Sequence, residues 1–138
     1  MKNNCYNLHK CKVVNLPTLS DQRGDLTFLE SLNQIPFEIK RIYYLHNNNN
    51  LKRGAHAHKA LNQIVISISG SFDIKLDDGK LSKTFKLSNK NEGLLICPMI
   101  WRDLFNFSKD SESENQLSNW WPLLHLRVYL IMYISTYL

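Results

Sequence analysis

Short apolar runs alternate with turn residues along most of the chain, and this pattern constrains the fold more than any other feature. The run at residues 61–68 ends at Gly70, and the alternating run at 71–76 leads into the turn sequence Asp77-Asp78-Gly79. Turn signals every 8–12 residues or so are typical of antiparallel barrels and sandwiches. No stretch before residue 111 keeps a helical period over three turns. The sequence therefore predicts an all-β domain.

The strands can be assigned from β-branched and aromatic content and from the residues that end each run. The predicted strands are residues 12–16, 26–29, 37–45, 61–68, 71–76, 83–87, 93–97 and 103–107. A polar turn at 20–25 precedes the second of them. The asparagine run at 47–50 predicts a loop that reaches residue 53, because asparagine favours turns over regular structure.

Composition narrows the class of partner. The 138 residues correspond to about one domain, and 17 Lys and Arg against 12 Asp and Glu give a net charge of +5. These basic residues are scattered, whereas nucleic-acid binding needs them clustered, so a small anionic ligand is favoured and no nucleic acid is expected. The chain opens with polar residues, and its three cysteines form no CxxC pair. A cytoplasmic location in a reducing compartment is therefore expected.

The densest group of chemically active residues is the segment RGAHAHK at 53–59. On an extended strand, His56 and His58 project to the same face, where they fit either metal binding or proton transfer. A metal in such a barrel would also want a carboxylate and a third imidazole. Gln63 and Arg102 stand at the corresponding places, and neither is a useful metal ligand. Acid–base chemistry without a metal is therefore favoured.

Four segments, in this order and spacing, resemble the WxcM-like cupins, and within them the sugar-nucleotide 3,4-ketoisomerases. They are DQRGDL at 21–26, KRIYY at 40–44, RGAHAHK at 53–59 and PMIWR at 98–102. The resemblance implies a jelly-roll barrel (double-stranded β-helix) that works as a homodimer with no metal or other cofactor. It also implies conversion of dTDP-4-keto-6-deoxyglucose to the 3-keto sugar. That product would supply a 3-amino-3,6-dideoxyhexose for a cell-surface glycan such as lipopolysaccharide.

The resemblance suggests catalytic roles for particular residues. His58 is the first choice for the base that removes the C3 proton, and His56 is its partner at the enediolate oxygens. Strand parity puts Tyr43 and Tyr44 on opposite faces, and the resemblance favours Tyr44 as the one that lines the barrel and donates a proton or positions the sugar.

Candidate substrate-binding residues are Arg23, Arg41 and Arg53 for the pyrophosphate, together with Lys59, Gln63 and Arg102. A guanidinium pairs bidentately with phosphate oxygens, which supports the arginine assignments. Arg102 occupies a position where several relatives carry histidine, so it is predicted to hold the substrate or stabilise an oxyanion rather than to transfer protons.

The resemblance ends near residue 111, so we predict a cupin domain at 1–111 and an atypical tail at 112–138. Residues 120–138 are nearly long enough to span a bilayer, but Pro122, His125 and Arg127 argue against a membrane helix, and no membrane partner is expected. The alternation from Leu124 to Ile134 would suit a substitute strand. An appended, non-native end is slightly favoured, because a polar break at 112–119 lies where a strand is expected.

A second function remains open from the sequence. An altered C-terminus would be compatible with a cupin that binds a sugar nucleotide without turning it over. A metal-dependent cupin oxygenase is a more distant alternative. Solvent isotope exchange, ligand binding and metal analysis separate these three possibilities.

Overall fold

The computed structural model describes residues 7–46, 51–108 and 128–135, and nearly all of their regular structure is β-strand. The elements are η1 (Leu8–Lys10), β1 (Lys12–Asn15), β2 (Thr18–Asp21), β3 (Gly24–Thr27), β4 (Arg41–His46), β5 (Arg53–His56), β6 (Leu61–Ser67), β7 (Phe72–Asp77), β8 (Ser82–Leu87), β9 (Glu92–Ile96), β10 (Trp101–Phe105) and β11 (Val128–Ser135). The predicted all-β class is confirmed.

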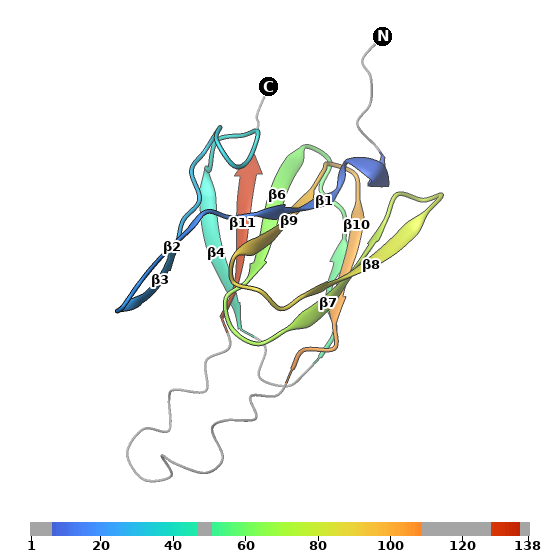
Figure 1. Ribbon diagram of the computed structural model, residues 1–138. Helices are drawn as coiled ribbons and strands as arrows, with labels where there is room; N and C mark the ends of the chain where they lie inside the picture. Colours follow the sequence, from blue (N-terminus) through green and yellow to red (C-terminus); the bar gives the residue numbers. More distant parts are fainter. Residues whose placement is uncertain (1–6, 47–50, 109–127, 136–138) are drawn as a thin grey trace.

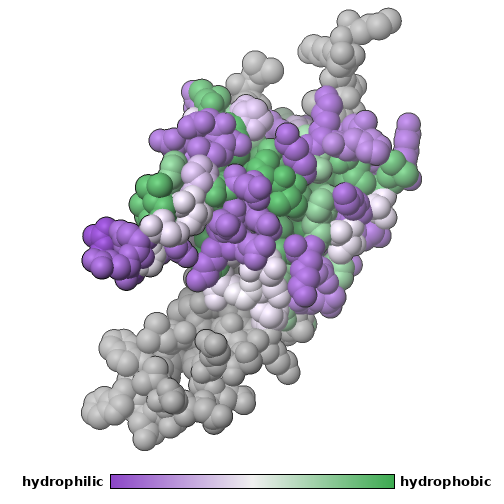
Figure 2. Space-filling model, viewed as in Figure 1, coloured by the Kyte–Doolittle hydropathy of each residue, from purple (hydrophilic) through white to green (hydrophobic). Residues whose placement is uncertain are grey.

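Two antiparallel sheets form the body of the domain (Figure 1). One has five strands in the order β1-β9-β6-β11-β4, and the other has four in the order β5-β10-β7-β8. Apart from β7 and β8, neighbours within these two sheets are not consecutive in sequence, as expected for a barrel built by crossing connections rather than a simple meander. A separate hairpin, β2-β3, projects from the body (Figure 1), and its tip is hydrophilic (Figure 2).

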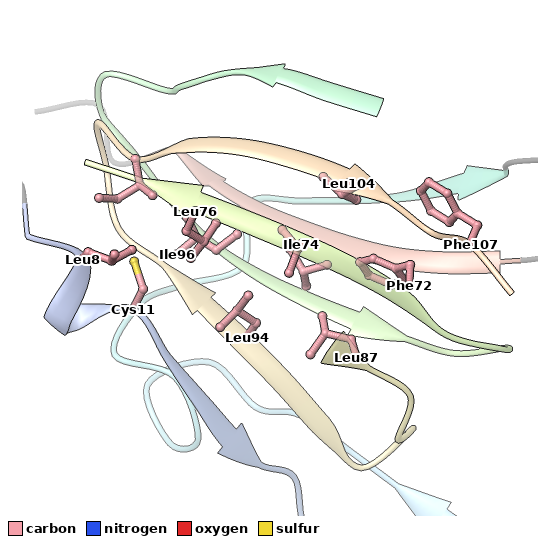
Figure 3. Packing of buried hydrophobic residues seen from close by; sticks show 12 residues of the cluster. Leu8, Cys11, Phe72, Ile74, Leu76, Leu87, Leu94, Ile96, Leu104 and Phe107 are labelled. Carbon is pink, nitrogen blue, oxygen red and sulfur yellow. The ribbon is translucent and has the colours of Figure 1, made fainter. Parts of the chain in front are cut away.

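The main apolar core fills the space between the two sheets (Figure 3). Phe72, Ile74 and Leu76 are alternate residues of β7, and all three are fully buried against the inner side chains of β9. Leu94 and Ile96 supply that opposing layer. The period of two along β7 is the pattern expected of a strand with one face on a core.

A second apolar cluster lies on the outer face of the five-stranded sheet. Ile64 and Ile66 of β6 pack there with Leu16, Ile35 and Phe37. Strand β6 therefore buries both of its faces, which explains why its apolar run is nearly continuous rather than alternating.

The structure differs from the predicted strands in three places. The region around the predicted turn at 20–25 forms the hairpin β2-β3, residues 37–40 precede β4 instead of belonging to it, and β5 begins at Arg53, in the predicted loop.

In the tail, β11 pairs with β4 on one side and with β6 on the other. The rest of the tail lies outside the described residues. Where the chain is described, no helix is long and apolar enough to cross a membrane.

Candidate functional site

A backbone irregularity between β5 and β10 sets the position of the histidines. Arg102 pairs with His56 and Asp103 with Gly54, so the register shifts by one residue between them. Gly54 has φ 92°, and a Cβ at this position would lie 2.6 Å from the Arg102 carbonyl oxygen. Ala55 is also in the left-handed region, with φ 57°. Bulges and strained residues of this kind often re-aim a side chain at a functional site.

The two imidazoles contact each other directly. Nε2 of His56 lies 3.2 Å from Nε2 of His58, and the rings are T-shaped with centroids 4.7 Å apart. The sequence predicts this juxtaposition from an extended strand, but β5 ends at His56. His58 is held instead by its own carbonyl, which accepts a 2.7 Å hydrogen bond from the backbone N–H of Met99.

Hydrogen bonding and charge determine the protonation of this histidine pair. Nδ1 of His56 lies 2.8 Å from the Gly54 carbonyl, which can only accept, so Nδ1 carries a proton. Burial, followed by the positive charges of Arg102 and His56, lowers the pKa of His58 to about 4. His58 is therefore neutral at pH 7. The 3.2 Å between the two Nε2 atoms is a hydrogen-bond distance, so one ring donates to the other.

A cavity of about 530 Å³ opens beside this pair. Its wall is formed by Tyr43, Leu45, Lys52, Arg53, Gly54, Ala55, His56, Gln63, Val65, Arg102 and Leu104. Gln63 and Arg102 are buried, at 1% and 3% exposure, whereas Lys52 and Arg53 are exposed on the same cavity. His56 thus lines the cavity, and His58 is reached from it through the Nε2–Nε2 contact.

The cavity brings together four of the predicted site residues: Arg53, His56, Gln63 and Arg102. An arginine pair beside a histidine pair can bind an anion and move a proton in one place. Within the described residues, no group of three or more His, Cys, Asp or Glu side chains is arranged to hold a metal ion.

Tyr44 does not line this cavity, contrary to the expectation from the resemblance. Its side chain is 60% exposed, and the neighbouring Ile42 lines a groove on the outer face of the sheet. Tyr43 lies on the cavity wall instead. The parity argument separates the two tyrosines correctly, but the choice between the two faces was wrong.

Three predicted substrate-binding residues lie away from the cavity wall. Arg23 is at the tip of the β2-β3 hairpin, where it forms an exposed ion pair with Asp21 at 2.5 Å. Arg41 begins β4 and Lys59 follows His58, and both are exposed. The assignment of Arg23 and Arg41 to the pyrophosphate, and of Lys59 to substrate binding, stays a prediction.

Lys52 and Tyr43 are cavity residues that the sequence did not single out. Lys52 follows the asparagine run and forms an ion pair with Asp103 at 3.3 Å. Its place directly before the RGAHAHK segment is a signal that could have suggested it. For Tyr43, the alternation with Leu45 gives a face of β4 but not the side on which the cavity lies.

Comparison with known proteins gives consistent matches. The family described as "WxcM-like, C-terminal" matches residues 9–116. A TDP-4-oxo-6-deoxy-alpha-D-glucose-3,4-oxoisomerase of Aneurinibacillus thermoaerophilus is 38% identical over 100 residues, covering 72% of each chain.

Solved structures of two ketoisomerases also match nearly the whole chain. The TDP-quinovose 3,4-ketoisomerase WlaRB of Campylobacter jejuni is 38% identical, with a TM-score of 0.76 over 93% of this chain and 87% of that one. A mutant of the 3,4-ketoisomerase QdtA of Thermoanaerobacterium thermosaccharolyticum, in complex with TDP-4-keto-6-deoxyglucose, is 29% identical, with a TM-score of 0.77 over 95% and 84%. The predicted cupin-type barrel is thereby confirmed.

Proposed function

Because this chain belongs to the WxcM-like family and is a sugar-nucleotide 3,4-ketoisomerase, we propose that it converts dTDP-4-keto-6-deoxyglucose into the dTDP-3-keto-6-deoxyhexose. The observation that carries the proposal is the contacting pair His56 and His58 beside a cavity with a buried arginine. The product's ketone at C3 is the group that a later transamination needs to make a 3-amino-3,6-dideoxyhexose for a cell-surface glycan.

The reaction moves two protons within the substrate. The C4 ketone acidifies the C3–H bond, and a base removes that proton to give an enediolate. A proton is then returned at C4, while the hydroxyl proton passes from the C3 oxygen to the C4 oxygen. Substrate and product have the same oxidation state overall, so the step needs no redox cofactor, and none is proposed.

The histidine pair is suited to this exchange. His58 is neutral at pH 7 and can accept a proton, and His56 lines the cavity within hydrogen-bond distance of His58. We assign the base to His58, acting with His56 as one unit, and assign stabilisation of the enediolate oxygens to His56 and Arg102. Positioned acid–base groups contribute about 10²–10⁴-fold, and charge stabilisation in a buried site adds substantially to that.

The pyrophosphate is assigned to the basic rim of the cavity. Arg53 and Lys52 are exposed there and can reach phosphate oxygens without desolvating a buried charge. Arg23, Arg41 and Lys59 remain candidates for longer-range contacts with the nucleotide.

Solvent exchange tests the activity directly. Purified protein incubated with dTDP-4-keto-6-deoxyglucose in deuterated water should introduce deuterium at C4 of the 3-keto product. NMR and mass spectrometry would detect it. Folded protein that binds dTDP but gives neither exchange nor product would favour the non-catalytic sugar-nucleotide-binding cupin, and activity that follows added metal would favour a metal-dependent enzyme.

Two variants separate chemistry from binding. His58→Asn should lower kcat by at least about 10²-fold and change dTDP affinity little, because it removes proton transfer rather than a ground-state contact. Arg53→Ala should mainly weaken dTDP binding. An unchanged kcat in the first variant rejects His58 as the base, and an unchanged affinity in the second removes Arg53 from the phosphate site.

A homodimer is also proposed, formed through the outer face of the five-stranded sheet. That face has a groove of about 780 Å³ between the sheet and the β2-β3 hairpin, and Ile42 and Tyr44 are exposed on β4 beside it. Sedimentation of the wild type and of Ile42→Glu tests this. A wild-type dimer and a monomeric Ile42→Glu variant support the proposal, and a monomeric wild type rejects it.

The cytoplasmic location stays a prediction.

A further inference from the structure

The cavity contains a buried amide without a partner. Gln63, on β6, is 1% exposed and lines the cavity, yet neither its Nε2 nor its Oε1 has a hydrogen-bond partner within the part of the chain that the structure describes. Buried side-chain polar atoms are almost always hydrogen-bonded, and leaving them unsatisfied destabilises the folded state.

The surroundings of Gln63 make a purely structural role a poor explanation. Val65 on the same strand and Leu104 on the opposite sheet are apolar neighbours on the same cavity wall, so an apolar side chain of similar volume would pack there at lower cost. By contrast Ser67, also buried on β6, donates a 2.9 Å hydrogen bond to the Gly70 carbonyl. Ser67 is a buried polar residue with a structural bond, and Gln63 is not.

The side-chain amide of glutamine suits one kind of ligand group. It offers an acceptor oxygen and a donor NH₂ side by side, so it matches a ligand that presents a donor and an acceptor side by side. A vicinal hydroxy-ketone presents this pair, and so does the enediolate that forms from it. His56 and Arg102 line the same cavity, and His58 contacts His56, so the sugar's reacting carbons belong next to this amide.

We propose that Gln63 positions the sugar by pairing with its C3 and C4 oxygens. Nε2 donates to the ketone oxygen, and Oε1 accepts from the neighbouring hydroxyl. This inference rests on the proposed function and adds to it the group that holds the hydroxy-ketone. The bound sugar would give both polar atoms of the Gln63 side chain a hydrogen-bond partner.

Gln63→Met tests this role, because methionine has a similar shape and no hydrogen-bonding amide. The melting temperature should stay the same or rise, since an unsatisfied buried group is removed. Affinity for dTDP alone should stay within about twofold, and kcat/KM for the keto sugar nucleotide should fall about 10- to 100-fold. Gln63→Leu repeats the test if the first variant folds poorly.

Ser67→Ala is the matched control on the same strand. It should lower the melting temperature, because it removes a satisfied structural bond, and leave kcat/KM unchanged. Gln63→Met should therefore lower activity without lowering stability, and Ser67→Ala should lower stability without lowering activity. A Gln63→Met protein with wild-type kcat/KM overturns the proposal, as does one whose affinity for dTDP falls as much as its activity.

Binding without turnover keeps this test separate from the activity itself. If the wild type gives no isotope exchange, the proposed function fails, and the affinity ratio between dTDP-4-keto-6-deoxyglucose and dTDP still decides on Gln63. A preference for the keto sugar that disappears in Gln63→Met supports the inference. A ratio that is the same in both proteins overturns it.

Discussion

Tyr43 and Tyr44 show how much a single residue step changes on a strand. Tyr43 lines the cavity with His56, and Tyr44 is exposed on the outer face. We predict that Tyr43→Phe lowers kcat/KM about tenfold by removing a hydroxyl from the site, and that Tyr44→Phe leaves it unchanged. Steady-state kinetics on both proteins checks this, and the reverse result would restore Tyr44 as the catalytic candidate.

His58 gives a pH prediction. Its pKa is lowered to about 4, first by burial and then by Arg102 and His56, so its neutral form persists well below pH 6.5. NMR titration of the His58 ring should give a midpoint near 4, and Arg102→Met should raise it by removing a positive charge. A wild-type midpoint near 6.5 would contradict the burial argument.

The lowered pKa of His58 also determines how the stability of the fold changes with pH. The unfolded chain binds a proton at His58 near pH 6.5 and the folded chain only near pH 4, so the unfolded state gains stability as the pH falls through this window. The contribution of His58 to folding is therefore fully present above about pH 6.5 and decreases towards pH 4.

Among single residues, the sequence predicted the contacting histidines His56 and His58, and it predicted Arg102 as a residue of the same site. The HAH spacing and the always-charged Arg102 allow acid–base chemistry without a metal set. The face of Tyr44 could not be predicted from the pattern, because the five-stranded sheet has an apolar cluster on each side. With both faces apolar, alternation along β4 identifies two faces without saying which one faces the cavity.

Strand β5 depends on Gly54 for its irregular path. An alanine there would need φ 92° and would place its Cβ 2.6 Å from a backbone carbonyl of β10. We predict that Gly54→Ala destabilises the fold by about 1–3 kcal/mol. It should also lower kcat/KM more than tenfold, because a shifted backbone would move the carbonyl at residue 54 that accepts the His56 hydrogen bond. Denaturant unfolding and kinetics together check both effects.

Gly79→Ala is a matched control for that variant. Gly79 has a similar φ of 87°, but a Cβ there would meet nothing within 4 Å. It should cost only the backbone strain and leave activity unchanged. If both variants lost activity equally, the close approach of β5 to β10 would not be what positions His56.

Most strands of the two sheets were predictable because their apolar residues alternate and glycines or polar turns end them. Strand β7 is the clearest case, with Phe72, Ile74 and Leu76 buried in turn. Strand β5 was not predictable, because RGAH contains no β-branched or large apolar residue and its pairing with β10 carries the bulge. Long-range pairing forms this strand, and local propensity does not.

For the whole molecule, the all-β class followed from the pattern and the jelly-roll barrel from the family resemblance, whereas the position of β11 followed from neither. Alternation after residue 124 allows a strand, but nothing local says that it pairs between β4 and β6. The sequence favoured an appended end because a polar stretch interrupts the chain at 112–119. In the structure, residues 128–135 lie inside the five-stranded sheet, so the tail bears on whether the barrel closes.

The tail can be tested by removing the strand and by interrupting it. Without β11, β4 and β6 lose their shared neighbour, and both would present unpaired backbone groups. Deletion of residues 120–138 should therefore lower solubility and the melting temperature sharply.

Ile131→Pro should also lower the melting temperature. Ile131 is paired with Val65 on one side and with Tyr43 on the other, and proline has no N–H to donate to the strand pairing. Ile131→Val, which keeps the backbone N–H, is the control and should lower the melting temperature much less than Ile131→Pro. If the deletion and Ile131→Pro both leave melting and activity unchanged, the tail is an appended end and the barrel folds without it.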